Sequence, residues 1–239
     1  MPGVKVLVVG ESGSGKSASL NGFDENEVAV FNVSGKPMPF KKKLPVMNTS
    51  SMKTIAEMIK RNDRNCYVVD DAGLAMTFYL FGKVSETGYT KFTQVAKDFY
   101  DMVQAVDQCS DDTIVYFMMH SERSDDGSKV KAKTAGKMID TQLTLESLFT
   151  IVLYCMTDGK RHYFVTQSDG VNTAKSPMGM FPLEIDNDLK AVDTAIREYY
   201  GLAANGTPVK KKEEPKKDGS SLAAKVAGVV EKASKIPEG

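Results

Sequence analysis

Short apolar runs alternate with helical patterns along most of the chain. Six runs are almost continuously apolar, as is typical of strands buried on both faces of a sheet. They cover residues 4–9, 28–33, 66–69, 113–119, 149–155 and 163–166.

Between these runs, apolar residues recur every three or four positions, which predicts three amphipathic helices. The first is capped by Ser50 or Ser51, the second begins near Phe92, and the third follows a cap at Asp186 or Asn187. Strands that alternate with helices predict an α/β fold with a mostly parallel central sheet and helices on both faces.

The sequence changes character after Gly201. Residues 205–221 combine proline, glycine and a lysine–glutamate run with few apolar side chains, which predicts a flexible basic linker. Residues 222–239 carry an apolar stripe at helical spacing. This is typical either of a short amphipathic helix that docks on a partner or on the parent domain, or of a solubilising tail. We therefore expect one folded domain over residues 1–204.

The chain has no net charge, because 31 lysines and arginines balance 31 aspartates and glutamates. The balance is uneven, since residues 205–239 hold eight lysines against five acidic residues. Only five of the basic residues are arginines. This distribution excludes a protein that coats DNA through bulk charge, but it allows local basic loops to contact DNA.

Three widely spaced cysteines and only two histidines argue against a disulfide framework and against a zinc site. No apolar run approaches the roughly 18 residues that cross a bilayer, and the N-terminal residues do not have the pattern of a signal peptide. We therefore expect a reduced, cytoplasmic protein without a membrane association.

Residues 10–17 match the phosphate-binding loop (P-loop) pattern G-x-x-x-x-G-K-[ST], after an apolar strand and before an expected helix. Glycines let successive backbone N–H groups turn toward phosphate oxygens, and the helix presents its positive end to the same anion. In this pattern the lysine reaches the β- and γ-phosphates and the last hydroxyl binds Mg²⁺. The residues expected to hold the nucleotide are Gly10, Glu11, Ser12, Gly13, Ser14, Gly15, Lys16 and Ser17.

A P-loop also needs a carboxylate at the end of a neighbouring buried strand to hold the Mg²⁺ water shell. The run at residues 66–69 is followed by Asp70 and Asp71. We assign Asp70 to the metal shell. Asp71 is either the base that polarises the attacking water or a turn residue.

His120 directly follows the run at residues 113–119, and the carboxyl ends of parallel strands form the ligand crevice of such sheets. It either donates a hydrogen bond to the γ-phosphate or is satisfied by loop carbonyls. Residues 121–136 lack apolar periodicity and are expected to form a loop, whose alternating cations either grip a DNA backbone or form a solvated face. The candidate DNA-binding residues are Arg123, Lys129, Lys131, Lys133 and Lys137.

Lys175 lies in a loop flanked by glycine and proline. If this loop projects from the domain, Lys175 is placed to reach the γ-phosphate of a neighbouring subunit as a cationic finger. The alternative is an ordinary surface lysine.

Together these motifs resemble the phage-encoded, single-domain RecA-like P-loop ATPases (AAA family ATPases), some of which are single-strand-annealing recombinases. The resemblance spans residues 3–203 and rests on residues 10–17, 67–71, 117–122, 136–140, 149–153, 166–170 and 174–177. It implies a RecA-like core, ATP and Mg²⁺ as cofactors, and a homo-oligomer with nucleotide between subunits. It also implies single-stranded DNA as the partner in recombination or replication inside a bacterial host cell. The resemblance does not include the C-terminal tail, for which we separately expect contact with a single-strand-binding protein or a helicase.

Two positions depart from the RecA-type pattern. No glutamate follows residues 28–33 to activate water, and residues 163–182 contain no arginine finger. Slow ATP turnover is therefore expected. Two other functions remain open: an ATP-switched helicase loader or adaptor, and a nucleotide or small-molecule kinase, which the scarcity of arginines disfavours.

Overall fold

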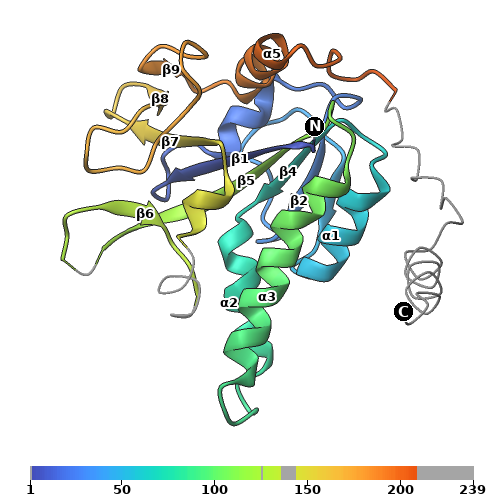
Figure 1. The fold of residues 1–239 in the computed structure, drawn as a ribbon, viewed down its shortest axis with the longest axis vertical. Helices are drawn as coiled ribbons and strands as arrows, with labels where there is room; N and C mark the ends of the chain where they lie inside the picture. Colours follow the sequence, from blue (N-terminus) through green and yellow to red (C-terminus); the bar gives the residue numbers. More distant parts are fainter. Residues whose placement is uncertain (1, 125, 136–143, 209–239) are drawn as a thin grey trace, which may run out of the picture.

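The structure, a computed structural model, describes residues 2–124, 126–135 and 144–208 (Figure 1). These residues form a nine-stranded, mostly parallel sheet with helices on both faces, which confirms the expected α/β architecture. The strands are β1 (Val4–Gly10), β2 (Ala29–Asn32), β3 (Val46–Asn48), β4 (Cys66–Asp70), β5 (Ile114–Arg123), β6 (Val130–Ala132), β7 (Ile151–Thr157), β8 (His162–Val165) and β9 (Glu184–Asp186). The α-helices are α1 (Met52–Arg61), α2 (Ala72–Gly82), α3 (Thr90–Gln104) and α5 (Leu189–Tyr200), and the 3₁₀ helices are η1 (Ser17–Gly22), η2 (Ala105–Gln108) and η3 (Leu145–Leu148).

The strand order places the strand that leads into the P-loop inside the sheet. The order is β3-β2-β4-β5-β1-β7-β8-β9, and β6 pairs with β5 outside this path. Neighbours from β3 to β7 are parallel, whereas β8, β9 and β6 are antiparallel to their partners. Because β5 lies between β1 and β4, the carboxyl ends of these three strands bring the P-loop, His120 and Asp70 to one edge of the sheet.

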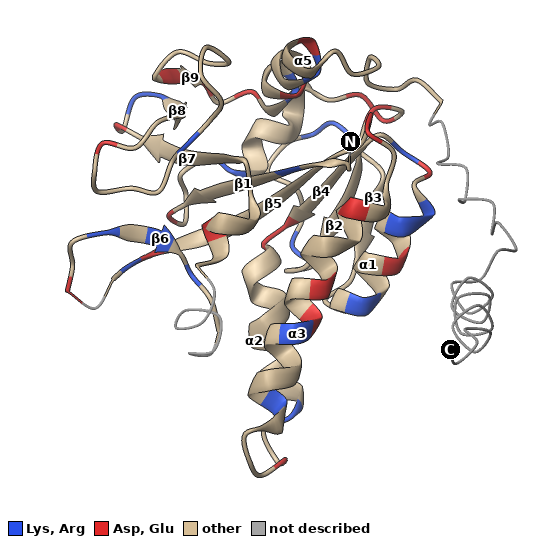
Figure 2. Ribbon diagram, viewed as in Figure 1, with Lys and Arg blue, Asp and Glu red and all other residues tan. Residues whose placement is uncertain are grey.

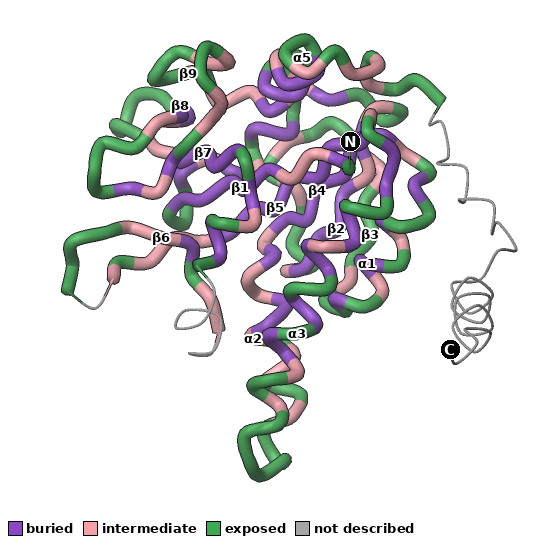
Figure 3. The backbone as a smooth tube through the Cα atoms, in the orientation of Figure 1, coloured by how far each residue is buried: buried purple, intermediate pink, exposed green. Residues whose placement is uncertain are grey.

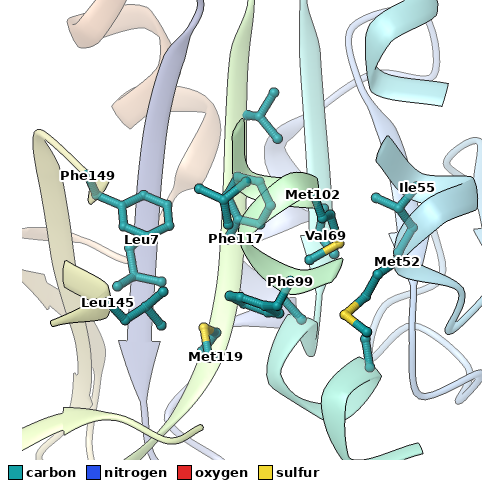
Figure 4. Packing of buried hydrophobic residues seen from close by; sticks show 14 of the residues in the cluster. Leu7, Met52, Ile55, Val69, Phe99, Met102, Phe117, Met119, Leu145 and Phe149 are labelled. Carbon is teal, nitrogen blue, oxygen red and sulfur yellow. The ribbon is translucent and has the colours of Figure 1, made fainter. Parts of the chain in front are cut away.

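The side chains of β1 alternate between two apolar layers. Leu7 and Val9 pack in the layer that α1, α2 and α3 cover, whereas Val6 and Val8 pack in the layer that η1 and α5 cover. Figure 4 shows the first layer, where Leu7 lies beside Phe117 of the neighbouring strand β5. A strand covered on both faces has no polar side, which explains why its sequence is continuously apolar.

The helix caps agree with the sequence in one case and differ in the other. Ser51 caps α1, as its Oγ accepts a hydrogen bond from the backbone N–H of Thr54 at 3.2 Å. The cap of α5 is Asp188, whose carboxylate accepts from the N–H groups of Lys190 and Ala191. The prediction of Asp186 or Asn187 is therefore wrong. Three polar residues in a row can each cap a helix, and only the backbone path selects one of them.

Several elements were not anticipated from the apolar pattern. α2 follows Asp71 directly, and its sequence is apolar on all sides, so the helical period is absent. β3 and β9 have three residues each, too few for a periodic signal. The expected loop at residues 121–136 is wrong at both strands of a hairpin, because β5 continues to Arg123 and pairs with β6 at Val130–Ala132. The longer strand reflects backbone pairing, which side-chain polarity does not reveal.

Helices α2 and α3 form a hairpin that extends beyond the sheet (Figures 1 and 3). Its end exposes large apolar side chains, among them Phe81 at 71% and Tyr89 at 87%. α3 has 15 residues and is the longest of the described helices. Within the described ranges, no helix is both long enough and apolar enough to cross a membrane.

A buried polar network joins the end of the fold to the sheet. Arg197 is 4% exposed, and its guanidinium donates to the carboxylate of Asp193 at 2.7 Å and to the backbone carbonyl of Asn65 at 2.7 Å. Asn205 also donates to Asp193, and the N–H of Gly206 donates to the side chain of Asn65. The described fold thus extends past residue 204, while the apolar stripe at residues 222–239 lies outside the described residues.

Candidate functional site

The P-loop leaves β1 at Gly10 and needs glycine at several points. Gly13 and Gly15 have φ angles of +80° and +103°, which side-chain-bearing residues rarely adopt. A Cβ on Gly10 would lie 2.5 Å from the carbonyl oxygen of Cys155, so glycine also permits the close approach to β7. The loop leads into η1, a 3₁₀ helix of six residues, rather than into the expected α-helix. A 3₁₀ helix this short has a smaller dipole than the expected α-helix, so the positive helix end beside the loop is weaker than the sequence pattern predicts.

Lys16 is folded against the loop. Its side chain is 6% exposed, and Nζ donates to the carbonyls of Gly10 and Glu11 at 2.8 Å each. Burial lowers the pKa of Lys16, while the nearby carboxylates of Asp71 and Asp70 act in the opposite direction. The ammonium group is thus held by the first two residues of the loop, Gly10 and Glu11.

Ser17 and Asp70 meet directly although they are far apart in the sequence. The Ser17 hydroxyl donates to Oδ1 of Asp70 at 3.0 Å. Asp70 is 3% exposed, and burial, followed by the charge of Asp71, raises its pKa to about 6. Burial of the ionised carboxylate is unfavourable in the protein alone, because few hydrogen bonds and positive charges offset the loss of hydration. A carboxylate oxygen beside a hydroxyl oxygen is the kind of ligand pair that Mg²⁺ prefers.

Asp71 and His120 form a second pair at the same edge. Nε2 of His120 lies 3.3 Å from Oδ1 of Asp71, and hydrogen bonds from His120 and Ser34 lower the pKa of Asp71. Asp71 has φ = +59° and begins α2, but its carboxylate does not cap that helix. Its side chain points to the site instead. The pKa of Asp70 is therefore raised and that of the adjacent Asp71 is lowered. Perturbed pKa values of this kind are common at functional sites.

These residues line a cleft of about 370 Å³ over the P-loop. The chain segment after β2 forms part of its wall, with Ser34 and Lys36 among the lining residues. His162, at the start of β8, also lines the cleft. Ser34, Lys36 and His162 cannot be recognised as site residues from the sequence, because their neighbours in the sequence carry no recognisable motif.

Side chains from beyond residue 150 hold two carbonyls of the P-loop. Nδ1 of His162 donates to the carbonyl oxygen of Ser14 at 2.8 Å, and the thiol of Cys155 contacts the same oxygen at 3.1 Å. Nδ2 of Asn187 donates to the carbonyl oxygen of Gly15 at 3.0 Å. No spacing in the sequence indicates these contacts, since the partners are 141 to 172 residues apart.

The basic segment after His120 contains a two-stranded antiparallel ribbon, formed by the end of β5 and by β6, and lysines lie along β6 (Figure 2). Glu122 is paired with Lys131 across the ribbon, with Oε1 and Nζ 3.7 Å apart, while Arg123 alternates to the other face. Arg123 and Lys133 line a second cleft, of about 710 Å³, which shares Ser12 and His120 with the first. Lys129 is exposed at the end of the ribbon, and Lys137 lies outside the described residues.

Lys175 is exposed, but its backbone is fixed to the sheet. Its N–H donates to the carbonyl of Val152 at 2.9 Å, and its carbonyl accepts from the N–H of Val152 at 2.8 Å. It does not line the cleft over the P-loop. A role toward a neighbouring subunit therefore stays a prediction.

Comparison of the sequence with protein-family models and with curated proteins finds no match. The resemblance to RecA-like phage ATPases therefore rests on the motifs in this chain alone.

Proposed function

We propose that this protein binds ATP with Mg²⁺ and hydrolyses it slowly as a RecA-like P-loop ATPase. The observation that carries the proposal is the contact between Ser17 and Asp70 across 53 residues, directly beside Lys16. A phosphate loop alone is a common pattern, and the contact adds the second part that nucleotide-binding loops use, a carboxylate from a neighbouring strand beside the loop hydroxyl. When bound, Mg²⁺ would neutralise charge on the phosphates, and Ser17 and Asp70 would hold it.

The chain's own residues supply the other parts of the reaction. Lys16 leaves its loop carbonyls to contact the β- and γ-phosphates. Asp71, held at the site by its contact with His120, is placed to accept a proton from the attacking water, and its lowered pKa makes it a weak base, in keeping with slow turnover. The proposed ATPase thus uses the Asp71–His120 pair in place of the glutamate found in RecA-type enzymes.

We further propose that the substrate that controls hydrolysis is single-stranded DNA. The second cleft carries this proposal through Arg123 and Lys133, which line it together with the acidic residues Glu11 and Glu122 and with Ser12 and His120 of the ATP cleft. A DNA backbone in this cleft would lie next to the γ-phosphate end of the nucleotide. The assignment to annealing or strand exchange, and the oligomer with nucleotide between subunits, follow from the resemblance alone.

The test measures Mg²⁺-dependent ATP binding and ATP turnover, with and without single-stranded DNA, over a series of salt concentrations. We expect Lys16→Ala to abolish ATP binding while the fold is retained. Arg123→Ala/Lys133→Ala should reduce DNA stimulation and lower the salt slope of DNA binding by about one per lost phosphate contact. The matched control is Lys60→Ala/Arg61→Ala, which removes the same charge from the exposed end of α1.

The outcomes separate the candidate functions. ATP binding that survives Lys16→Ala would show that the P-loop assignment is wrong. Transfer of phosphate to a nucleoside or nucleotide would identify a kinase instead. ATP binding without any response to DNA, together with binding to a helicase, would favour the loader or adaptor.

A further inference from the structure

The ATP cleft has one wall that the proposed catalytic groups do not use. His162 begins β8, its side chain is exposed, and it lines the cleft on the side away from Asp70. The strand order explains this placement, because β4 and β5 lie on one side of β1 while β7 and β8 lie on the other.

The His162 ring is fixed over the P-loop. A carbonyl oxygen only accepts hydrogen bonds, so the 2.8 Å contact with Ser14 requires the proton on Nδ1. The ring also lies against Gly15, where an added Cβ would be 3.0 Å from Cγ of His162. One edge of the imidazole is thus attached to the loop, and the rest of the ring faces the cleft.

The direction of a bound triphosphate follows from the metal ligands. Ser17 and Asp70 would hold the metal and would therefore mark the γ-phosphate end, on the side of β4 and β5. The nucleoside must then leave the P-loop toward β7 and β8. The neighbouring Arg161 is engaged elsewhere, because it pairs with Glu184 at 2.8 Å and stacks on the ring of Tyr163.

We propose that His162 binds the nucleoside part of the nucleotide, with the base or ribose packed against its imidazole ring. This inference rests on the proposed ATP site and adds the residue that distinguishes a nucleoside triphosphate from a bare triphosphate. Planar rings stack on nucleobases irrespective of sequence or base type, so we expect little discrimination between purines from this contact.

The experiment compares the dissociation constants of ATP and of inorganic tripolyphosphate, both with Mg²⁺. His162→Asn keeps a hydrogen-bond donor near the position of Nδ1 but removes the ring. We expect it to retain tripolyphosphate binding and to weaken ATP binding about 10-fold. His162→Phe keeps a ring but loses the bond to Ser14, so both ligands should weaken about 5-fold and their ratio should stay unchanged.

Lys160→Ala is the matched control, because Lys160 is exposed in the same β7–β8 hairpin and does not line the cleft. It should change neither constant. If His162→Asn leaves the ratio of the ATP and tripolyphosphate dissociation constants as in the wild type, His162 does not contact the nucleoside and the proposal is wrong. Equal wild-type affinity for both ligands would also overturn it while leaving the triphosphate site intact. Failure of the wild type to bind either ligand would instead refute the proposed ATP site.

Discussion

Replacing Asp70 with asparagine should stabilise the protein while removing the proposed Mg²⁺ ligand. The carboxylate of Asp70 is 3% exposed, and burial is the main reason that its pKa is raised from the usual 3.8 to about 6. This difference corresponds to about 3 kcal/mol of disfavoured charge at neutral pH. Asparagine keeps the acceptor for Ser17 but adds an amide that needs its own partner, at a cost of about 1 kcal/mol. We therefore expect Asp70→Asn to raise the free energy of unfolding by about 2 kcal/mol at pH 7.

The pH dependence of this effect has a definite sign. Because the pKa of Asp70 is higher in the folded state than in the unfolded state, folding takes up a proton between about pH 4 and pH 6. The stability of the wild type should therefore fall as the pH rises through this range, and the variant should lack this component. Below about pH 4 the advantage of Asp70→Asn should disappear, since Asp70 is then protonated in both states.

The assay is urea unfolding at pH 4 and pH 7, followed by the same measurement with MgATP. MgATP should stabilise the wild type and not Asp70→Asn. Asp71→Asn is an internal control of opposite sign, because hydrogen bonds lower the pKa of Asp71 and its charge is favourable in the fold. The reasoning would be refuted if Asp70→Asn were no more stable than the wild type at pH 7. It would also be refuted if the variant exceeded the wild type in free energy of unfolding by the same amount at pH 4 and pH 7.

Other parts of the structure give tests by the same urea titration. Gly15→Ala should lower the free energy of unfolding by about 3 kcal/mol and abolish ATP binding, since φ is +103° and the new Cβ would lie 2.7 Å from Nδ2 of Asn187. Gly13→Ala should lower it by only about 1 kcal/mol, because the new Cβ meets no neighbour and only the backbone is strained. Equal costs would contradict the clash. Arg197→Ala should cost about 3–5 kcal/mol, because it leaves a buried carboxylate unpaired; a cost below about 1 kcal/mol would show that the network is not stabilising. Truncation after residue 208 should preserve the free energy of unfolding, while truncation after residue 204 should lower it by about 2 kcal/mol, because the hydrogen bonds of residues 205–207 are lost. If the two truncated proteins are equally stable, the fold ends at residue 204.

The apolar pattern was sufficient for the parallel centre of the sheet. Strands such as β1 and β4 are buried on both faces, and such strands have continuously apolar sequences. The pattern failed where backbone pairing decides the structure. The continuation of β5 through polar residues to Arg123, and the short strand β6, depend on hydrogen bonds that any side chain permits.

The sequence by itself determined the P-loop and its expected metal carboxylate, because glycines at fixed spacing and an acidic residue after a buried strand are local requirements. Only the tertiary structure decided which side chains complete the site. The contact of Ser17 with Asp70, the pairing of Asp71 with His120, and the support of the loop by His162 join distant segments. Their common cause is the strand order, which brings the carboxyl ends of β4, β5, β1 and β7 to one edge and which no local pattern of residues encodes.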